Sequence, residues 1–297
     1  MVGSAIKKSL EEKGYTNLVY RTRKQMNLLD ETKVANFFRE EKPDYVFLAA
    51  AKVGGIIANR DYPAEFIYDN LKIQLNLIHQ AYLHEVKGLC FLGSTCIYPK
   101  LAPQPLKEEY LLTGALEPTN EAYAIAKIAG MKMCQFYNQQ YKTNFIFTMP
   151  TSLYGINDSF DPQNSHVIPA LMRRLHEAKL NNTPSIKIWG TGKPKREFMY
   201  VDDLADALVF LMNNYKESEL INIGIGEDME ILEIARGIAK VVGYTGEIET
   251  DPTKPDGTPR KLVDTTKLTK LGWKPKTDFE RGLKITYNWF LENYDKL

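Results

Sequence analysis

The sequence lacks the features of membrane, disulfide-stabilised and strongly charged proteins. Its 297 residues contain no apolar run near the roughly 20 residues that a membrane-spanning helix needs. The formal net charge is only +1, which does not favour binding to nucleic acids or to an acidic membrane surface. The three cysteines, Cys90, Cys96 and Cys134, do not have the spacing of a disulfide framework or a metal site. We therefore expect a cytoplasmic globular protein without a metal, nucleic-acid or membrane partner.

A second absence lies at the N-terminus. Nucleotide-binding domains with a doubly wound sheet usually open with a strand and a Gly-rich turn that leads into a helix. Here Met1-Val2-Gly3-Ser4 matches only the end of such a turn, and the helix that follows is expected to end near Gly14. We therefore expect an N-terminally truncated Rossmann-type sheet. On this expectation the first strand and the early glycines would be missing, which would take a ladder partner from the neighbouring strands and most N–H groups from the phosphate cradle.

Strand-like and helix-like segments alternate along the chain. Strands are predicted at 17–20, 45–51, 89–94, 145–149, 186–189 and 221–224, and helices at 31–41, 63–86, 120–141, 165–178, 202–213, 230–242 and 278–293. This alternation is typical of an α/β fold, a doubly wound parallel sheet with helices on both faces. We predict one domain over residues 1–155 and a smaller C-terminal α/β lobe over residues 156–297, from which some segments return to the first domain.

Tyr123 and Lys127 stand four residues apart in the predicted helix 120–141. On a helix, both side chains project from one face. A nearby ammonium favours the phenolate and lowers the pKa of the phenol, which brings it toward acid/base use. The lysine has further donors for a cofactor ribose. The alternative is an exposed helix that carries both residues by chance.

A cluster of small polar residues, Gly-Ser-Thr-Cys at 93–96, follows the apolar run 89–92. In open α/β sheets, ligands bind outside the carboxyl ends of the strands. A Ser94 hydroxyl at such an end can donate to a substrate carbonyl that Tyr123 protonates. The alternatives are an ordinary strand-to-loop turn and, for Cys96, a small buried apolar side chain.

Two arginines, Arg21 and Arg23, follow the predicted strand 17–20. Proteins specific for NAD place an acidic residue in this turn to bind the ribose 2′-hydroxyl. Guanidinium groups instead suit a 2′-phosphate, so we expect NADP(H) as the cofactor. The alternative is a solvated basic turn.

Seven segments follow one another in order over nearly the whole chain: RTRKQMNLLD, AAAKVGGI, FLGSTCIYPK, EPTNEAYAIAK, NSHVIPAL, REFMYVDD and KPDGTPRK. With Ser94, Tyr123 and Lys127, they resemble the extended short-chain dehydrogenase/reductases and, within these, the GDP-L-fucose synthase family. The resemblance implies NADPH-dependent 3,5-epimerisation and 4-reduction of GDP-4-keto-6-deoxy-D-mannose to GDP-L-fucose. It also implies a homodimer formed through a four-helix bundle.

The resemblance also implies roles for individual residues. Tyr123 would protonate the C4 oxygen, Lys127 would lower the pKa of Tyr123 and bind the nicotinamide ribose, and Ser94 would orient the carbonyl. Cys96 and His166 would be the acid/base pair of the epimerisation. The implied cofactor-binding residues are Met1, Val2, Gly3, Arg23, Leu28, Leu92, Gly93, Ser94, Thr95, Lys127, Pro150, Thr151, Ser152, Leu153 and His166. The implied substrate-binding residues are Arg174, Trp189, Arg196, Asp256 and Lys261.

Two departures from the family pattern leave other functions open. The Gly-rich turn is incomplete, and Ser152 stands where related enzymes often have Asn. One alternative is a related sugar-nucleotide epimerase or dehydratase that retains its NAD(P) cofactor, which would usually carry a different acid/base set from Cys96 and His166. The other is a non-catalytic relic that has lost its phosphate loop, which a cofactor titration would distinguish.

Overall fold

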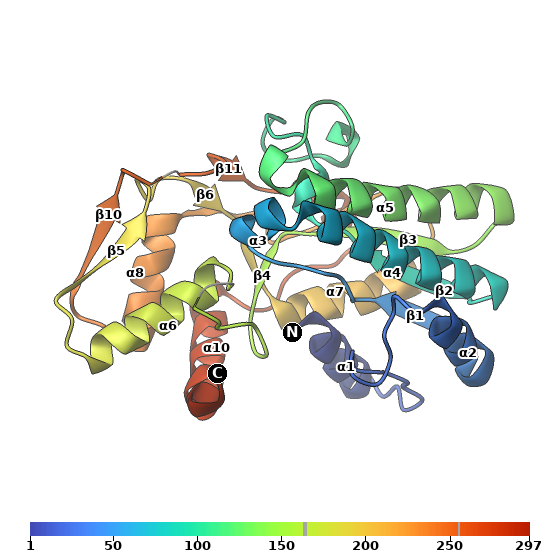
Figure 1. The fold of residues 1–297 in the computed structure, drawn as a ribbon, viewed down its shortest axis with the longest axis horizontal. Helices are drawn as coiled ribbons and strands as arrows, with labels where there is room; N and C mark the ends of the chain where they lie inside the picture. The colour runs from blue at the N-terminus through green and yellow to red at the C-terminus, as the bar shows by residue number, and fades with distance from the viewer. Residues whose placement is uncertain (163–164, 255) are drawn as a thin grey trace.

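In the computed structural model, a four-stranded parallel sheet lies between two layers of helices, and a second lobe of helices and short strands lies beside it (Figure 1). The structure describes residues 1–162, 165–254 and 256–297, and only the backbone of Ile56. Asn164 and Pro255, which belong to two of the seven segments above, lie outside the described residues.

The sheet has the strand order β1-β2-β3-β8, with all neighbours parallel. Its strands are β1 (Tyr45–Leu48), β2 (Gly88–Leu92), β3 (Phe145–Pro150) and β8 (Ile221–Ile223). Side chains of β2 alternate between the two faces, so Leu89 and Phe91 pack with α4 (Pro63–Leu83) and α5 (Glu121–Tyr141). Cys90 and Leu92 pack on the other face with α1 (Val2–Glu12) and α7 (Val201–Asn214). The predicted doubly wound α/β fold is therefore confirmed.

The strand predicted at 17–20 is wrong, because the structure has no strand there. Val19 is 42% exposed and Tyr20 is 60% exposed. β1 is the edge of the sheet, and in the described part of the chain no strand pairs with its free side. A β-prone segment forms a strand only when its backbone N–H and C=O groups find a partner, and residues 17–20 have none.

The predicted helices are confirmed to within a few residues, and local sequence explains their ends. α2 (Glu31–Glu41) starts at Asp30, whose carboxylate accepts a hydrogen bond from the Lys33 N–H. α4 starts with Pro63, which fits the first helical turn because its missing N–H is not needed there. No helix in the described part of the chain is long and apolar enough to cross a membrane.

The second lobe has its own core, in which α6 (Val167–Leu180), α8 (Ile231–Val242) and α10 (Phe279–Asn293) pack together. Its short strands are β5 (Ser185–Trp189) paired with β10 (Glu247–Asp251), and β6 (Lys195–Arg196) between β11 (Arg260–Lys261) and β9 (Met229–Glu230). β4 (Ser152–Tyr154) pairs with β7 (Phe198–Tyr200) where the two lobes meet. The remaining short elements are α3 (Ile56–Asp61), α9 (Thr266–Lys270), η1 (Thr95–Ile97), η2 (Glu108–Tyr110), η3 (Pro118–Asn120) and η4 (Tyr294–Lys296).

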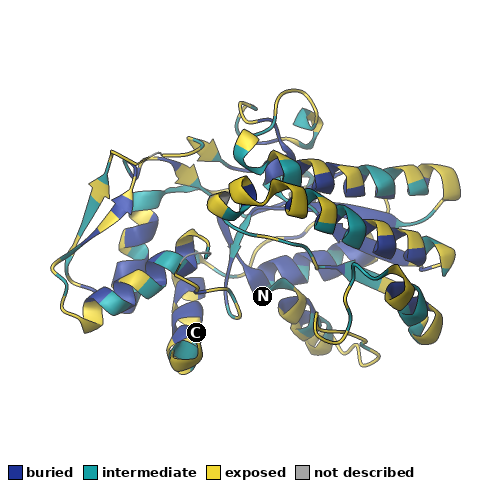
Figure 2. Cartoon of the chain, viewed as in Figure 1, coloured by how far each residue is buried: buried dark blue, intermediate teal, exposed yellow. Residues whose placement is uncertain are grey.

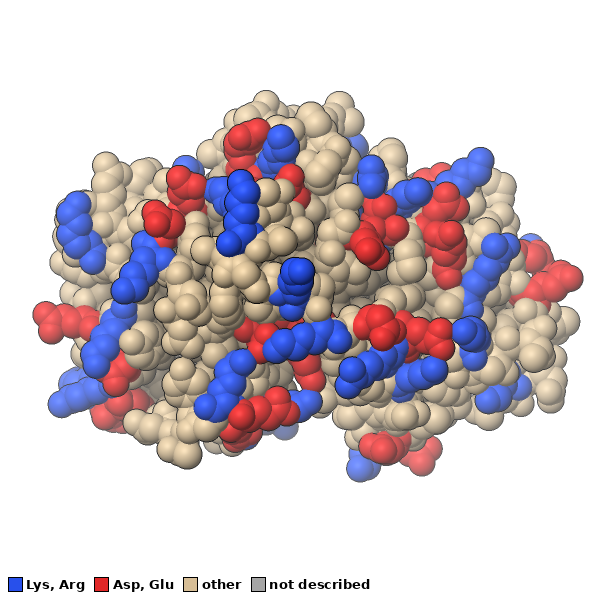
Figure 3. All heavy atoms as spheres, turned by 180° about the vertical axis from the view of Figure 1, so that it is seen from behind, with Lys and Arg blue, Asp and Glu red and all other residues tan. Residues whose placement is uncertain are grey.

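Burial and surface charge follow this arrangement. Buried residues lie along the sheet and on the helix faces that touch it, while exposed residues lie on the outer helix faces (Figure 2). On the face seen in Figure 3, acidic and basic side chains are interspersed, and no large field of one sign covers it. This mixture agrees with the near-neutral net charge of the sequence.

The contact between α4 and α5 yields a test of the packing. A Cβ at Gly130 would lie 2.7 Å from the side chains of Gln74 and Phe91, and the Gln74 amide also donates to the Ala126 carbonyl. Gly130→Ala gains about 1 kcal/mol of helix propensity, but overpacking costs about 1–3 kcal/mol. We expect a net loss of unfolding free energy in a urea titration. The control Gly237→Ala in α8, where a Cβ meets Phe279 at an ordinary 3.5 Å, should be stabilising, and a stabilised Gly130→Ala protein would contradict the close packing.

Candidate active site

The candidate site lies where two neighbouring parallel strands, β2 and β3, end. β2 is followed by residues 93–95 and β3 by Thr151–Leu153, so both predicted cofactor segments lie at one edge of the sheet. The Gly93 N–H donates to the Thr148 carbonyl at 2.8 Å. A Cβ at Gly93 would lie 2.3 Å from the Met149 methyl carbon, so the absence of a side chain allows this close approach.

Lys127 is buried beneath this edge and is only 4% exposed. Its Nζ donates to the Leu92 carbonyl at 2.8 Å and lies 4.8 Å from the centre of the Phe91 ring. Burial lowers the pKa of Lys127 to about 8, because the ammonium loses hydration without a carboxylate partner among the described residues. An ammonium has three donors, so Lys127 keeps capacity for a ligand hydroxyl.

Tyr123 lies one helical turn before Lys127 on α5, and the Lys127 Nζ is 5.8 Å from the centre of the Tyr123 ring. Its ring packs edge-on against Phe66, at 6.4 Å between centroids. Burial raises the pKa of Tyr123, and the nearby Cys96 adds to the effect. The expected lowering of this pKa by Lys127 is therefore absent, because both groups are desolvated and the amine bonds the Leu92 carbonyl instead. The phenol stays protonated at neutral pH, which is the form that can donate a proton.

Cys96 lies in η1, directly after β2, and is 6% exposed. Burial raises the pKa of its thiol, while a hydrogen bond with Ser94 and the positive charges of Lys261 and Lys127 act in the opposite direction. Cys96 and Lys261 line the same small cavity of about 20 Å³, which has room for about one water molecule. Ser94, Cys96, Tyr123 and Lys127 thus form one electrostatically coupled group.

His166 lies outside this group. It is the exposed N-cap residue of α6, and its side chain makes no capping hydrogen bond. Its charge acts on Asp158, whose pKa burial raises, while His166 and the N-terminal amine act to lower it. Within the described residues His166 makes no hydrogen bond to Cys96 or Tyr123, so the structure does not join the predicted acid/base pair.

Residues predicted to bind the cofactor lie at two further places. Met1, Val2 and Gly3 open α1, where a Cβ on Gly3 would meet open space. Arg21 forms an ion pair with Glu41, whereas Arg23 is exposed and has no ion pair within the described ranges. The Leu28 carbonyl accepts a hydrogen bond from Asn76 at 2.8 Å. The Arg23 guanidinium suits a 2′-phosphate, and the spare donors of Lys127 suit a ribose hydroxyl. Gly93 has no side chain and so lets a ligand approach the backbone closely. These residues therefore fit a nicotinamide dinucleotide with a 2′-phosphate.

Two of the predicted substrate-binding cations lie side by side. Arg196 on β6 and Lys261 on β11 are register partners in a parallel strand pair. Burial lowers the pKa of both, and the charge of Arg196 lowers that of Lys261 further. Neither forms an ion pair with a carboxylate in the described parts of the chain. Adjacent desolvated cations are costly unless an anion compensates them, so this pair is suited to a phosphate-bearing ligand.

The other predicted substrate residues, Asp256, Trp189 and Arg174, also belong to the second lobe. Asp256 accepts from the Thr191 N–H at 2.6 Å, and a Cβ at Gly190 would collide with it. Trp189 is 62% exposed, with the Lys254 amine 5.8 Å from its ring centre. Arg174 donates to the Lys187 carbonyl at 2.6 Å. The exposed indole offers a flat apolar surface for a ring.

Glu197 is a residue of this region that the sequence did not predict. Its carboxylate is 1% exposed and accepts hydrogen bonds from the backbone. The signal that marks it is a carboxylate placed directly before the buried strand β7, where a charge must be compensated.

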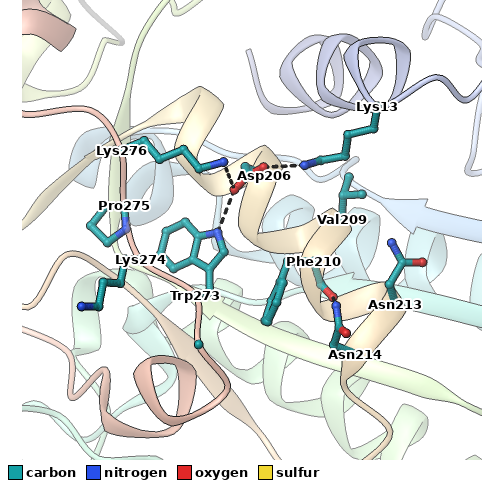
Figure 4. A pocket seen from close by; sticks show the side chains of 11 residues that line it. Lys13, Asp206, Val209, Phe210, Asn213, Asn214, Trp273, Lys274, Pro275 and Lys276 are labelled. Carbon is teal, nitrogen blue, oxygen red and sulfur yellow. Dashed lines mark hydrogen bonds and ion pairs between the residues drawn. The ribbon is translucent and has the colours of Figure 1, made fainter.

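A larger hollow of about 530 Å³ lies elsewhere, between α1, α7 and the loop 272–276 (Figure 4). Asp206 on α7 forms ion pairs there with Lys13 at 2.6 Å and Lys276 at 3.0 Å. Its carboxylate also accepts from the Trp273 indole N–H at 2.9 Å. These bonds occupy Lys13, Asp206 and Lys276, three of the four charged residues that line the hollow, so its size alone does not make it the candidate active site.

The sequence matches known proteins over nearly its whole length. The NAD dependent epimerase/dehydratase family matches residues 1–224. Putative GDP-L-fucose synthase 2 of Arabidopsis thaliana is 59% identical over 293 residues, which cover 99% of this chain and 89% of the relative. GDP-L-fucose synthase of Escherichia coli is 55% identical over 305 residues, which cover 100% and 95%. The solved GDP-L-fucose synthetase of Naegleria fowleri, bound to NADP, has a TM-score of 0.92 at 30% identity and covers 99% and 92%.

The chain therefore belongs to the NAD dependent epimerase/dehydratase family. Within that family its relatives place it among the GDP-L-fucose synthases.

The burial of Lys127 yields a pH test. Its folded pKa of about 8 lies below the roughly 10.4 of an unfolded lysine, so the unfolded chain binds more protons between these values. Stability from this group therefore rises as pH increases from 8 to above 10, by about 3 kcal/mol. Over this range we expect the unfolding free energy of wild type to rise by that amount relative to the unfolding free energy of Lys127→Met. The exposed Lys274→Met control should track wild type, and a constant difference for Lys127→Met would contradict the lowered pKa.

Proposed function

We propose that the chain catalyses NADPH-dependent 3,5-epimerisation and 4-reduction of GDP-4-keto-6-deoxy-D-mannose to GDP-L-fucose. The observation that carries the proposal is the position of the group Ser94, Cys96, Tyr123 and Lys127. It lies at the end of β2, and Cys96 shares a cavity with Lys261, one of the two unpaired cations. The group provides acid/base chemistry, and the cations provide a binding point for a diphosphate. The names of the close relatives agree with both parts.

The epimerisation requires proton removal next to a ketone. A carbonyl at C4 acidifies the hydrogens on C3 and C5, and inversion needs a base on one face and an acid on the other. We assign this pair to Cys96 and His166, because a perturbed thiol and an imidazole can both titrate near neutrality. The charges of Lys261 and Lys127 favour the thiolate of Cys96 against the effect of its burial. His166 belongs to the segment after Asp158, so we expect it to approach the sugar from the second lobe.

The reduction requires a proton for the C4 oxygen. NADPH supplies the hydride when it is bound. Tyr123 donates the proton, since burial keeps its phenol neutral until charge develops on the oxygen. Ser94 orients the ketone by hydrogen bonding, and Lys127 holds the cofactor ribose with the donors that the Leu92 carbonyl leaves free. Arg23 binds the 2′-phosphate, which gives the preference for NADP(H).

The binding roles divide between the two parts of the chain. We assign the cofactor mainly to residues 1–155 and the GDP-sugar mainly to residues 156–297. Arg196 and Lys261 bind the diphosphate as desolvated cations, with Arg174 and Asp256 as further contacts. Trp189 packs against a ring of the ligand with its exposed indole.

We further propose a homodimer formed through α4 and α5. Exposed apolar residues recur on α4 at Tyr68, Leu75 and Leu83, and on α5 at Ile125 and Phe136. Their spacing of seven to eleven residues places them near one face of each helix. Two copies that bury these faces would form a four-helix bundle. We place the protein in the cytoplasm, whose reducing conditions suit its three free cysteines.

A product assay tests the function directly. We expect incubation with GDP-4-keto-6-deoxy-D-mannose and NADPH to yield GDP-L-fucose. In Tyr123→Phe the proton donor is lost, so NADPH oxidation should fall at least about a hundredfold while deuterium exchange from solvent at C3 and C5 continues. NADPH absorbance and mass spectrometry of the sugar measure the two steps. A product reduced at C4 with C3 and C5 unchanged would contradict the epimerase part, and normal reduction by Tyr123→Phe would contradict the role of Tyr123.

Replacement of the thiol should affect the other step. We expect Cys96→Ser to slow deuterium exchange at C3 and C5 about a hundredfold, since a serine hydroxyl is a much weaker base than a thiolate. Hydride transfer to a substrate that is already epimerised should change far less. Tyr123→Phe serves as the matched comparison, because we expect it to lose hydride transfer and to keep deuterium exchange. An equal loss of both steps in Cys96→Ser would show that the thiol is not specific to epimerisation.

A further inference from the structure

Glu197 is a buried carboxylate at the junction of β6 and β7, between Arg196 and Phe198. It is 1% exposed. One carboxylate oxygen, Oε1, accepts from the Ile225 N–H at 2.6 Å and from the Gly226 N–H at 2.8 Å. The other, Oε2, accepts from the Val263 N–H at 3.0 Å. The carboxylate thus joins the loop after β8 to the segment directly after β11.

The surroundings of Glu197 are built for a carboxylate. A Cβ at Gly224 would lie 2.3 Å from Glu197 Oε1 and 2.4 Å from a methyl of Val263, so only glycine leaves the required room. Burial raises the pKa of Glu197, and the hydrogen bonds from the backbone act against this rise. No cation pairs with the carboxylate in the described segments, so hydrogen bonds from three backbone N–H groups and from the Thr151 side chain compensate it. Burying a carboxylate costs desolvation free energy, and here that cost is offset by hydrogen bonds that also fix the positions of the donor groups.

The segments that Glu197 connects carry proposed ligand-binding residues. Its own backbone N–H donates to the Lys261 carbonyl at 3.3 Å, and its backbone carbonyl accepts from the Thr151 hydroxyl at 3.3 Å. Arg196 precedes it in the chain, and Val263 follows Lys261 by two residues. β6 and β11 are only two residues long each, so their own ladder fixes them weakly. The carboxylate bond to Val263 adds a third point that holds β11 against β6.

We propose that Glu197 is a positioning residue that fixes the register of β6 and β11 and so presents Arg196 and Lys261 together to the diphosphate of the substrate. This role rests on the proposed function. Glu197 itself does not touch the substrate. It acts through the backbone of residues 225–226 and 263, which sets the distance between the two cations.

Glu197→Gln isolates this role because it changes one atom and keeps the shape. The amide oxygen can take the place of Oε1 and accept from Ile225 and Gly226. The amide nitrogen then faces the Val263 N–H, and two donors oppose each other. Only the hydrogen bond from Val263, which holds β11, is therefore lost. Glu108→Gln is a matched control, since its carboxylate accepts from the Asn222 backbone N–H at 3.1 Å and a glutamine oxygen can replace it.

The test measures binding of GDP and of NADPH by titration calorimetry, together with kcat and KM, in the full chain. We expect Glu197→Gln to weaken GDP binding and raise the KM for the GDP-sugar about tenfold, while kcat and the affinity for NADPH stay within about threefold. Glu108→Gln should match wild type in all four values.

Other outcomes separate the two levels of the proposal. If wild type does not bind GDP, the proposed function fails and the positioning role falls with it. If wild type binds GDP and Glu197→Gln binds it equally, the positioning role alone is wrong. If GDP affinity, NADPH affinity and kcat all fall together, Glu197 is merely structural and the proposal is also wrong. Should Glu197→Gln not fold, Glu197→Asp is the second variant. It keeps the charge but is too short to reach both the N–H groups of residues 225–226 and that of Val263, and the same outcomes apply to it.

Discussion

The hydrogen bond from the Lys127 ammonium to the Leu92 carbonyl is the contact on which the candidate site depends. It ties helix α5 to the last residue of β2, at 2.8 Å and out of contact with water. Tyr123 is one turn away on the same helix, and Ser94 and Cys96 follow the same strand. This buried bond, together with the packing of α5 on the sheet, therefore sets the position of the phenol relative to the hydroxyl and the thiol.

The same burial determines the protonation states of the site. Loss of hydration lowers the pKa of Lys127 to about 8 and raises those of Tyr123 and Cys96. In each case the neutral form is favoured, since a charge is costly where water is excluded. The phenol is thus a stable proton donor, while the thiol depends on nearby cations to become a base. The same buried environment therefore supports Tyr123 as an acid and, with the charges of Lys261 and Lys127 nearby, Cys96 as a base.

The sequence predicted those parts of the fold that local pattern determines. The helices follow from apolar spacing and from end signals such as Asp30 and Pro63, and the buried strands follow from short apolar runs. The strand at 17–20 was wrongly predicted because a strand depends on a neighbour, which local composition does not reveal. Glu197 was missed for a similar reason, since its partners lie 28 to 66 residues away in the chain.

The candidate site shows the same limit. The family pattern selected Tyr123, Lys127, Ser94 and Cys96, and the structure brings these four together. The predicted effect of Lys127 on Tyr123 was wrong, because spacing on a helix shows that two groups are close but not how far each is desolvated. The sequence also could not show that His166 lies at an exposed helix start next to Asp158.

The path of the chain between the lobes has a consequence for how the molecule comes apart. α7 and β8 come from the second half of the sequence but belong to the first lobe, and α8 and α10 then return to the second. The backbone therefore passes between the lobes more than once. A protease that nicks one connection leaves the halves tethered by the others, so neither lobe is a detachable module.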